Sequence, residues 1–141
     1  DRADGRNISI VTEPFADRIL WHNRKWTAEV LVNILENAVK YTSPGGSITI
    51  RVRSTEMYTE IAVQDTGRGI RPEELTEIFK RFYRSKDVEN LEGSGIGLYL
   101  SRLILEREKG YLTASSVPGE GSTFSVFLQN CQNLNQNLSG E

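Results

Sequence analysis

Apolar residues recur with the period of an α-helix over residues 24–41. The recurring positions are Trp26, Val30, Ile34, Ala38 and Tyr41. The stretch SPGG at 43–46 stops this pattern and turns the chain. A second amphipathic pattern runs from about Gly97 to Lys109 and ends at Gly110. We therefore expect two long helices, and a shorter one starting at Pro72, because proline suits the first turn of a helix.

Other segments alternate apolar and polar residues, which is the period of a β-strand. They are residues 7–12, 47–54, 58–65, 111–117 and 122–129. In the first of them, Ile8 and Ile10 share one face. Short connections separate the second segment from the third and the fourth from the fifth, so each of these pairs predicts a hairpin. Residues 13–23 are mixed, and we expect them to be irregular.

This order of elements does not form repeated βαβ units. It predicts an α+β fold, a two-layer sandwich in which helices cover one face of a mostly antiparallel sheet. Because the strands alternate, the second face of the sheet is expected to lie in water. Residues 130–141 are polar and rich in asparagine, and we expect a disordered tail there.

Composition and charge exclude several kinds of site and partner. The 141 residues suit one domain, and the net charge of −2 gives no reason to expect nucleic acid as a partner. Cys131 is the only cysteine and His22 the only histidine, which excludes an internal disulfide and a multi-histidine metal site. No apolar run approaches the roughly 20 residues of a membrane span. These features fit a cytosolic domain, and the start at Asp1 suggests a piece of a longer chain.

Three polar residues form a stripe along the first helix. At about 100° per residue, Asn33, Asn37 and Lys40 fall along the rim of the apolar face. The stripe is either a solvated helix edge or one wall of a cleft. Amide oxygens are suitable ligands for Mg²⁺ and a lysine suits a phosphate, so the second interpretation predicts a metal and phosphate site.

The stretch QDTGRGI at 64–70 follows a strand whose core-facing positions are Ile61 and Val63. Asp65 has the same parity, and a carboxylate on the core face is costly without hydrogen-bond donors. It either caps the following turn or accepts from a ligand, such as the exocyclic amine of a base. Gly67 and Gly69 would then let the backbone approach that ligand.

The stretch EGSGIGL at 92–98 is rich in glycine and opens into a helix. Backbone amides at a helix N-terminus favour an anion, so a polyphosphate is the natural guest. The spacing of Gly93, Gly95 and Gly97 is neither a P-loop nor a dinucleotide-binding fingerprint.

The motifs NILENAVKY, DTGRGI, FKRFYR, GSGIGL and GEGSTF occur in this order. Together they resemble the catalytic ATP-binding domain of sensor histidine kinases, in the wider family that includes HSP90, DNA gyrase B and MutL. The resemblance covers roughly residues 5–129. It implies a mixed five-stranded sheet under three helices, a catalytic domain over residues 1–129 and an ATP lid over about residues 71–93.

The resemblance also implies roles for individual residues. It makes Asn37 the main Mg²⁺ ligand with Asn33 assisting. The candidate catalytic residues are Asn33, Arg84 and Glu36, of which Glu36 would polarise an incoming nucleophile. The remaining nucleotide contacts that it implies are Lys40, Tyr41, Asp65, Gly67, Gly69, Ile70, Arg81, Phe82, Gly95, Ile96, Gly97, Leu98 and Ser122. In the lid, Phe79 and Phe82 would act as anchors, with Arg84 preferred over Arg81 for the γ-phosphate.

Two departures from the wider family sharpen the prediction. His22 lacks the context of a phosphoacceptor, so the acceptor histidine is expected on a separate dimerisation domain. Asn33 stands where the HSP90 and gyrase branches carry a glutamate that activates water. The implied function is therefore transfer of the γ-phosphate of Mg-ATP to a histidine, and indirectly to a response regulator, rather than hydrolysis.

Two alternatives stay open from the sequence. One is a serine kinase of the anti-sigma-factor type, which usually lacks the aromatic FKRFYR box. The other is a nucleotide-sensing module in which ATP only orders the lid. No nucleic acid and no direct membrane contact are expected for the domain, and a cytoplasmic location is expected.

Overall fold

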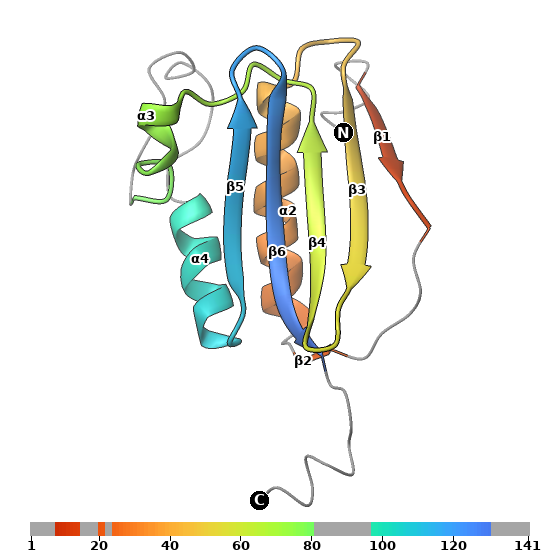
Figure 1. Ribbon diagram of the computed structural model, residues 1–141, viewed down its shortest axis with the longest axis vertical. Coiled ribbons are helices and arrows are strands. Elements are labelled where there is room, and N and C mark those ends of the chain that lie inside the picture. Colours follow the sequence, from red (N-terminus) through yellow and green to blue (C-terminus); the bar gives the residue numbers. More distant parts are fainter. Residues whose placement is uncertain (1–7, 15–19, 22–23, 81–96, 131–141) are drawn as a thin grey trace, which may run out of the picture.

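The computed structural model describes residues 8–14, 20–21, 24–80 and 97–130. The elements, labelled as in Figure 1, are β1 (Ser9–Thr12), β2 (Leu20–Trp21), α2 (Arg24–Tyr41), β3 (Ser47–Ser54), β4 (Tyr58–Asp65), α3 (Pro72–Leu75), α4 (Gly97–Arg107), β5 (Tyr111–Val117) and β6 (Gly121–Asn130). The strands β1, β3, β4, β6 and β5 lie side by side in this order, and the two-residue β2 pairs with the end of β6. β1 runs parallel to β3, and the other described pairs are antiparallel.

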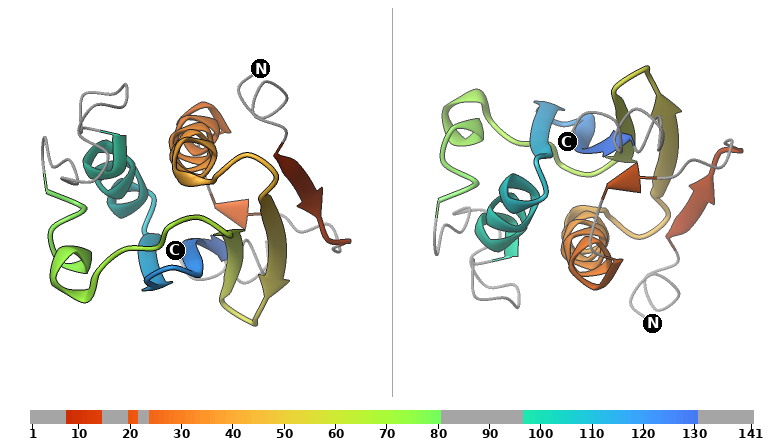
Figure 2. Two further views of the ribbon diagram at one scale, coloured as in Figure 1. Left: turned by 90° about the horizontal axis from the view of Figure 1, so that it is seen from above. Right: turned by 90° about the horizontal axis from the view of Figure 1, so that it is seen from below.

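The helices and the sheet form two layers. α2 and α4 lie side by side on one face of the sheet, and α3 flanks them on the side of β5 (Figures 1 and 2). This arrangement confirms the predicted α+β sandwich with a mixed sheet. The bounds of α2 and of the β3–β4 hairpin also agree with the sequence pattern. Within the described residues, no helix combines the length and the apolar character that a membrane span needs.

The core lies between α2, α4 and the inner face of the sheet. Val30, Ile34 and Ala38 of α2 are buried, which confirms the predicted helix face. The expectation was wrong for Trp26, which is 46% exposed, while the neighbouring Thr27 is buried in its place. The other buried apolar core residues are Ile8, Val39, Ile48, Val63, Ile78, Ile104, Leu105, Leu112, Phe124, Val126 and Leu128.

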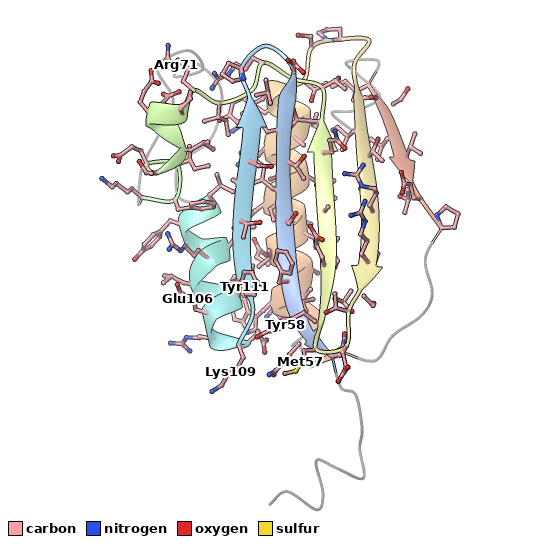
Figure 3. All side chains as sticks on the ribbon, in the orientation of Figure 1. Met57, Tyr58, Arg71, Glu106, Lys109 and Tyr111 are labelled. Atoms are coloured by element: carbon pink, nitrogen blue, oxygen red, sulfur yellow. The ribbon has the colours of Figure 1, made fainter. Side chains whose placement is uncertain are left out.

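The second face of the sheet carries polar pairs and an aromatic cluster. Arg51 donates to Gln64 Oε1 across β3 and β4 at 2.7 Å. Tyr111 stacks on Phe127 with ring centroids 4.4 Å apart, and Tyr58 meets Tyr111 edge-on at 5.6 Å. Figure 3 shows Tyr58 and Tyr111 near one end of this face, away from α2. The face therefore has the polar, solvent-facing character that alternation predicted, apart from these aromatic rings.

Three details differ from the sequence expectation. β2 lies within a segment expected to be irregular, because two residues give too short a pattern to be recognised. Ile10 is 45% exposed although Ile8 is buried, since β1 is an edge strand with one neighbour. The residue with left-handed backbone after α4 is Lys109 (φ 62°), while the Gly110 amide donates to the Leu105 carbonyl.

The last residue of β6 fastens the far end of the sheet. Asn130, which the sequence placed in the polar tail, is buried. Its Oδ1 accepts from Thr59 Oγ1 at 2.6 Å, and its Nδ2 donates to the carbonyls of Thr55 and Glu56. The ordered domain therefore includes Asn130, and the rest of the expected tail, 131–141, lies outside the described residues.

Candidate functional site

The polar stripe of α2 faces the start of α4. Asn33, Asn37 and Lys40 are half-buried, as the rim position predicts. Asn33 Nδ2 donates to the Gly97 carbonyl at 3.4 Å and to Ser101 Oγ at 3.2 Å. Because these bonds join α2 to the first turns of α4, the stripe and the start of α4 belong to one site.

Asn37 lies one turn beyond Asn33 on the same stripe. Its side-chain amide makes no hydrogen bond to any residue in the described part of the chain. Glu36 is exposed and lies about 60° around the helix from Asn33. The Asn37 amide oxygen therefore has no partner among the described residues, and Glu36 lies on the solvent side of the stripe.

The loop after β4 passes beside the last turn of α2. A Cβ on Gly67 would lie 2.5 Å from the Tyr41 carbonyl oxygen and 2.9 Å from Asp65 Oδ1, so only glycine fits there. The Arg68 guanidinium carbon lies 5.3 Å from the centroid of the Tyr41 ring, within cation–π range. The ends of β4 and α2 therefore form adjoining walls of the site.

Asp65 points inward at the end of β4, as its parity predicted, and only 5% of it is exposed. Its Oδ1 accepts from the Gly67 amide at 2.8 Å and from the Ser122 amide at 3.2 Å. Among the described residues, no hydrogen bond reaches its second oxygen, Oδ2. Burial raises the pKa of Asp65, against the lowering effect of these two amides. The bond from the Gly67 amide to Oδ1 confirms that Asp65 caps the turn, while its role toward a ligand stays a prediction.

The same loop is fastened to the β5–β6 hairpin. Gly69 has a left-handed backbone (φ 75°), and a Cβ there would lie 2.4 Å from the Val117 carbonyl oxygen. The Gly119 amide donates to the Arg68 carbonyl at 2.7 Å. Only glycine combines this backbone with so close an approach, and the loop is therefore held in one position against the hairpin.

Ser122 is buried at the start of β6, as its parity with Phe124 predicted. Its hydroxyl lies 3.0 Å from Ser116 Oγ, which also accepts from the Ile70 amide at 2.6 Å and donates to the Gly121 carbonyl at 2.9 Å. Sequence reasoning missed Ser116. The short turn between β5 and β6 could have revealed it, since it places Ser116 directly opposite Ser122.

The segments that flank the expected lid reach the core. Leu98 at the start of α4 is partly buried against the core. Phe79 packs edge-on to Phe124, with ring centroids 6.5 Å apart, and lies under the Arg102 guanidinium. The other predicted site residues of this region lie outside the described residues, as does His22; they are Arg81, Phe82, Arg84, Gly95 and Ile96.

The donor set suits a magnesium ion that is shared with a ligand. No group of three histidine, cysteine, aspartate or glutamate side chains within the described residues is placed to hold a metal alone. Mg²⁺, however, usually takes one or two protein oxygens and completes its shell with water and substrate phosphates. The amide oxygens of Asn37 and Asn33, one helical turn apart, fit this pattern.

Comparison with known proteins agrees with the geometry. The profile of the family described as "Histidine kinase-, DNA gyrase B-, and HSP90-like ATPase" matches residues 22–132. The chain belongs to this family. The match spans the α2 stripe, the loop after β4 and the closing hairpin, and it confirms the family predicted from the ordered motifs.

Curated relatives of this ATPase domain are sensor kinases. The sensor histidine kinase RppB of Synechocystis sp. is 37% identical over 110 residues, which are 77% of this chain and 24% of RppB. The sensor protein SrrB of Staphylococcus aureus is 31% identical over 129 residues, which are 90% of this chain and 22% of SrrB. The chain thus spans about a quarter of the length of the curated relatives that it matches.

Solved structures show the same fold. The catalytic domain of histidine kinase ThkA aligns with a TM-score of 0.78 and 24% identity, over 91% of this chain and 84% of that one. The mycobacterial sensor histidine kinase MprB aligns with a TM-score of 0.77 and 23% identity, over 92% of this chain and 88% of that one. The ATPase domain described here therefore has the architecture of histidine kinase catalytic domains.

Proposed function

We propose that this domain binds Mg-ATP and donates the γ-phosphate to a histidine on a dimerisation domain of the same kinase. Asp65 carries the proposal, because its carboxylate is buried, is fixed through one oxygen by two amides and keeps the other oxygen for a ligand. A lone acceptor in such a place is complementary to the amino group of adenine. Membership of an ATPase family, with sensor histidine kinases as relatives, supports the same assignment.

At the base end, Asp65 would accept a hydrogen bond from the adenine amino group, and Ser122 would lie beside it. Tyr41 would lie near the sugar or base, at the point where the loop after β4 crosses the end of α2. Gly67 and Gly69 would shape the floor of this pocket together with Ile70. Their backbone positions are set by the hairpin, so this end needs little rearrangement to bind a base.

At the phosphate end, Asn37 and Asn33 would hold Mg²⁺, and Lys40 would contact a phosphate. When bound, Mg²⁺ would supply charge neutralisation on the phosphate oxygens. The amides of Gly97 and Leu98, at the N-terminus of α4, suit an anion because the first amides of a helix have no partner within the helix. The contacts assigned to Gly95, Ile96, Arg81, Phe82 and Arg84 stay predictions.

The reaction would be an in-line phosphoryl transfer. A ring nitrogen of the acceptor histidine attacks the γ-phosphorus, a P–N bond forms, and the P–O bond to ADP breaks. ADP leaves with the electron pair of that bond. The attacking nitrogen uses its lone pair, and the other ring nitrogen, which carries the imidazole proton, releases it after the transfer. Most of the rate enhancement would come from positioning and charge neutralisation. Asn33 has no basic group that could activate water, which favours transfer over hydrolysis, and Glu36 would polarise the incoming imidazole from the edge of the stripe.

The partners follow from this chemistry. The phosphoacceptor domain is the direct partner, and a response regulator would receive the phosphate from it. We infer that the domain works in the cytoplasm, where ATP and response regulators are found. Neither nucleic acid nor a membrane surface enters the proposed reaction.

The chain should bind Mg-ATP and yet label itself only weakly. We would titrate it with ATP in Mg²⁺ by calorimetry, and then incubate it with γ-labelled ATP, with and without the dimerisation domain of its parent kinase. Label is expected on the histidine of the added domain, and it should disappear when that histidine is replaced. Label on His22, or turnover to free phosphate at the rate of transfer, would contradict the proposal.

A further inference from the structure

We infer that Ser116 is a positioning residue that sets the hydrogen-bonding direction of Ser122 and thereby selects a 6-amino purine over a 6-oxo purine. The inference rests on the proposed nucleotide function and deepens it by naming what determines the choice of base. Ser116 lies on β5, directly opposite Ser122 on β6. The length of the hairpin turn accounts for this position, and the contacts of the Ser116 hydroxyl indicate the role.

Three contacts converge on the Ser116 hydroxyl oxygen. The Ile70 amide donates to it at 2.6 Å, the Gly121 carbonyl lies 2.9 Å away, and the Ser122 hydroxyl lies 3.0 Å away. An amide can only donate and a carbonyl can only accept, while a serine hydroxyl has one proton to give. One assignment makes all three bonds together: Ser116 donates to Gly121 and accepts from both Ile70 and Ser122.

This assignment determines whether the Ser122 hydroxyl acts as a donor or an acceptor toward a ligand. Its hydroxyl proton is used in the bond to Ser116, so the lone pairs of its oxygen stay available on the other side. Its backbone amide meanwhile donates to Asp65 Oδ1 at 3.2 Å, which keeps the two residues close together. The buried end of the site therefore presents acceptors, namely Asp65 Oδ2 and Ser122 Oγ, and no side-chain donor from these two residues.

Two acceptors complement an amino group, which has two protons to donate. A 6-oxo purine would instead place a carbonyl oxygen against them, leaving buried acceptors without a donor, and such mismatches are strongly discriminated. Without the Ser116 hydroxyl, the Ser122 proton would be free to turn toward the ligand. Ser122 would then donate to a carbonyl, and the penalty on the 6-oxo base would shrink.

The decisive quantity is the ratio of affinities for ATP and inosine triphosphate, in which a carbonyl replaces the 6-amino group. Both would be titrated with Mg²⁺ into the full 141-residue chain and into Ser116→Ala. The ratio should fall about fivefold in Ser116→Ala, the value of one ordinary hydrogen bond. If Ser116 only holds the loop, Ser116→Ala should weaken the binding of both nucleotides equally. An unchanged ratio of the two affinities would therefore overturn the inference.

Three further variants sharpen the test. Ser116→Thr keeps the hydroxyl and should keep the ratio, while Ser115→Ala changes an exposed serine on the opposite face of β5 and serves as the matched control. Ser116→Ala combined with Ser122→Ala should give the same ratio as Ser122→Ala alone, because the first acts through the second. If the effects of the two substitutions multiply, the inference is wrong.

Stability and function are kept apart in the same experiment. Thermal unfolding shows whether Ser116→Ala is folded. If it is not, Ser116→Cys fills the same space with a poor hydrogen-bonding group and should lower the ratio of ATP to inosine triphosphate affinity in the same way. Failure of the unchanged chain to bind ATP would remove the proposed function itself. If the unchanged chain binds ATP tightly and selectively, and Ser116→Ala or Ser116→Cys is equally selective, only the role of Ser116 is contradicted.

Discussion

The two ends of the site differ in how their polar groups are satisfied. At the base end, Asp65 Oδ1 accepts from two amides, and the Ser116 hydroxyl meets three partners. At the phosphate end, the Asn37 amide makes no hydrogen bond to the described residues, and the start of α4 leaves its first amides without partners within the helix.

This difference suggests a division of labour. A base end that is already bonded holds its acceptors in place before the ligand arrives, which favours selectivity because little ordering remains to be done. In the proposed function, a phosphate end with open polar groups would be completed by the nucleotide and its metal.

The largest expected effect comes from Asp65→Asn at the base end. The amide oxygen can still accept from Gly67 and Ser122, but the amide nitrogen would present a donor to the adenine amino group. Affinity for Mg-ATP should fall roughly 100-fold. A loss of this size is expected when a hydrogen bond to a charged group is lost and two donors, the asparagine amide and the adenine amino group, face each other. Calorimetric titration measures this loss, and a loss below about threefold would show that Asp65 does not face the base.

Asn37→Ala probes the phosphate end. Removing one oxygen ligand should lower ATP affinity roughly tenfold in Mg²⁺ and much less in EDTA, because the Asn37 side chain makes no hydrogen bond within the described part of the chain. Glu29→Ala, on the exposed face of the same helix, is the matched control. An equal loss with and without Mg²⁺ would indicate that Asn37 is not a metal ligand. Neither substitution is expected to change the free energy of unfolding by more than about 0.5 kcal/mol.

Ser101→Ala tests the link between the two helices. Ser101 is fully buried and accepts from Asn33, so its removal should lower the free energy of unfolding by about 1 kcal/mol. The Asn33 amide keeps its bond to the Gly97 carbonyl, and ATP affinity should therefore change less than in Asn37→Ala. Urea unfolding and calorimetry give the two numbers. A larger effect on affinity than on stability would mean that Ser101 itself touches the nucleotide.

The smallest effect concerns pH. Burial raises the pKa of Asp65 above its usual value of 3.8, so the folded state binds this proton more tightly than the unfolded state. The free energy of unfolding should therefore fall as pH rises from 3.8 through the raised pKa, and this contribution is fully present below that interval. The difference between the unchanged chain and Asp65→Asn, measured by urea unfolding at several pH values, isolates it. A difference that grows in favour of the unchanged chain with rising pH would have the wrong sign.

Local patterns predicted the frame of the molecule well. The period of apolar residues and the SPGG stop predicted α2, and alternation predicted both hairpins. The position of Asp65 in the alternating strand predicted that it faces inward. These features depend on residues a few positions apart, which a sequence displays directly. Trp26 shows the limit of such patterns, because it recurs with the apolar period of α2 and is nevertheless 46% exposed.

The contacts that finish the site were not predictable in this way. Asn33 and Ser101 lie 68 positions apart, and Ile70 and Ser116 lie 46 apart, so their hydrogen bonds exist only after the layers have packed. The polar stripe of α2 therefore predicted a metal-binding face, but it did not indicate that Asn33 also hydrogen-bonds to α4. Ser116 was closest to prediction, since the length of the hairpin turn alone would have placed it opposite Ser122.

Amide hydrogen exchange, with and without Mg-ATP, tests the contrast between the two ends most directly. In the free chain, the amides of Gly67, Ile70 and Ser122 should exchange slowly because each already donates to a side-chain oxygen. Those of Gly97 and Leu98 should exchange rapidly, and Mg-ATP should slow them. Rapid exchange at the first three amides without nucleotide, or no slowing at the start of α4 with it, would contradict the account.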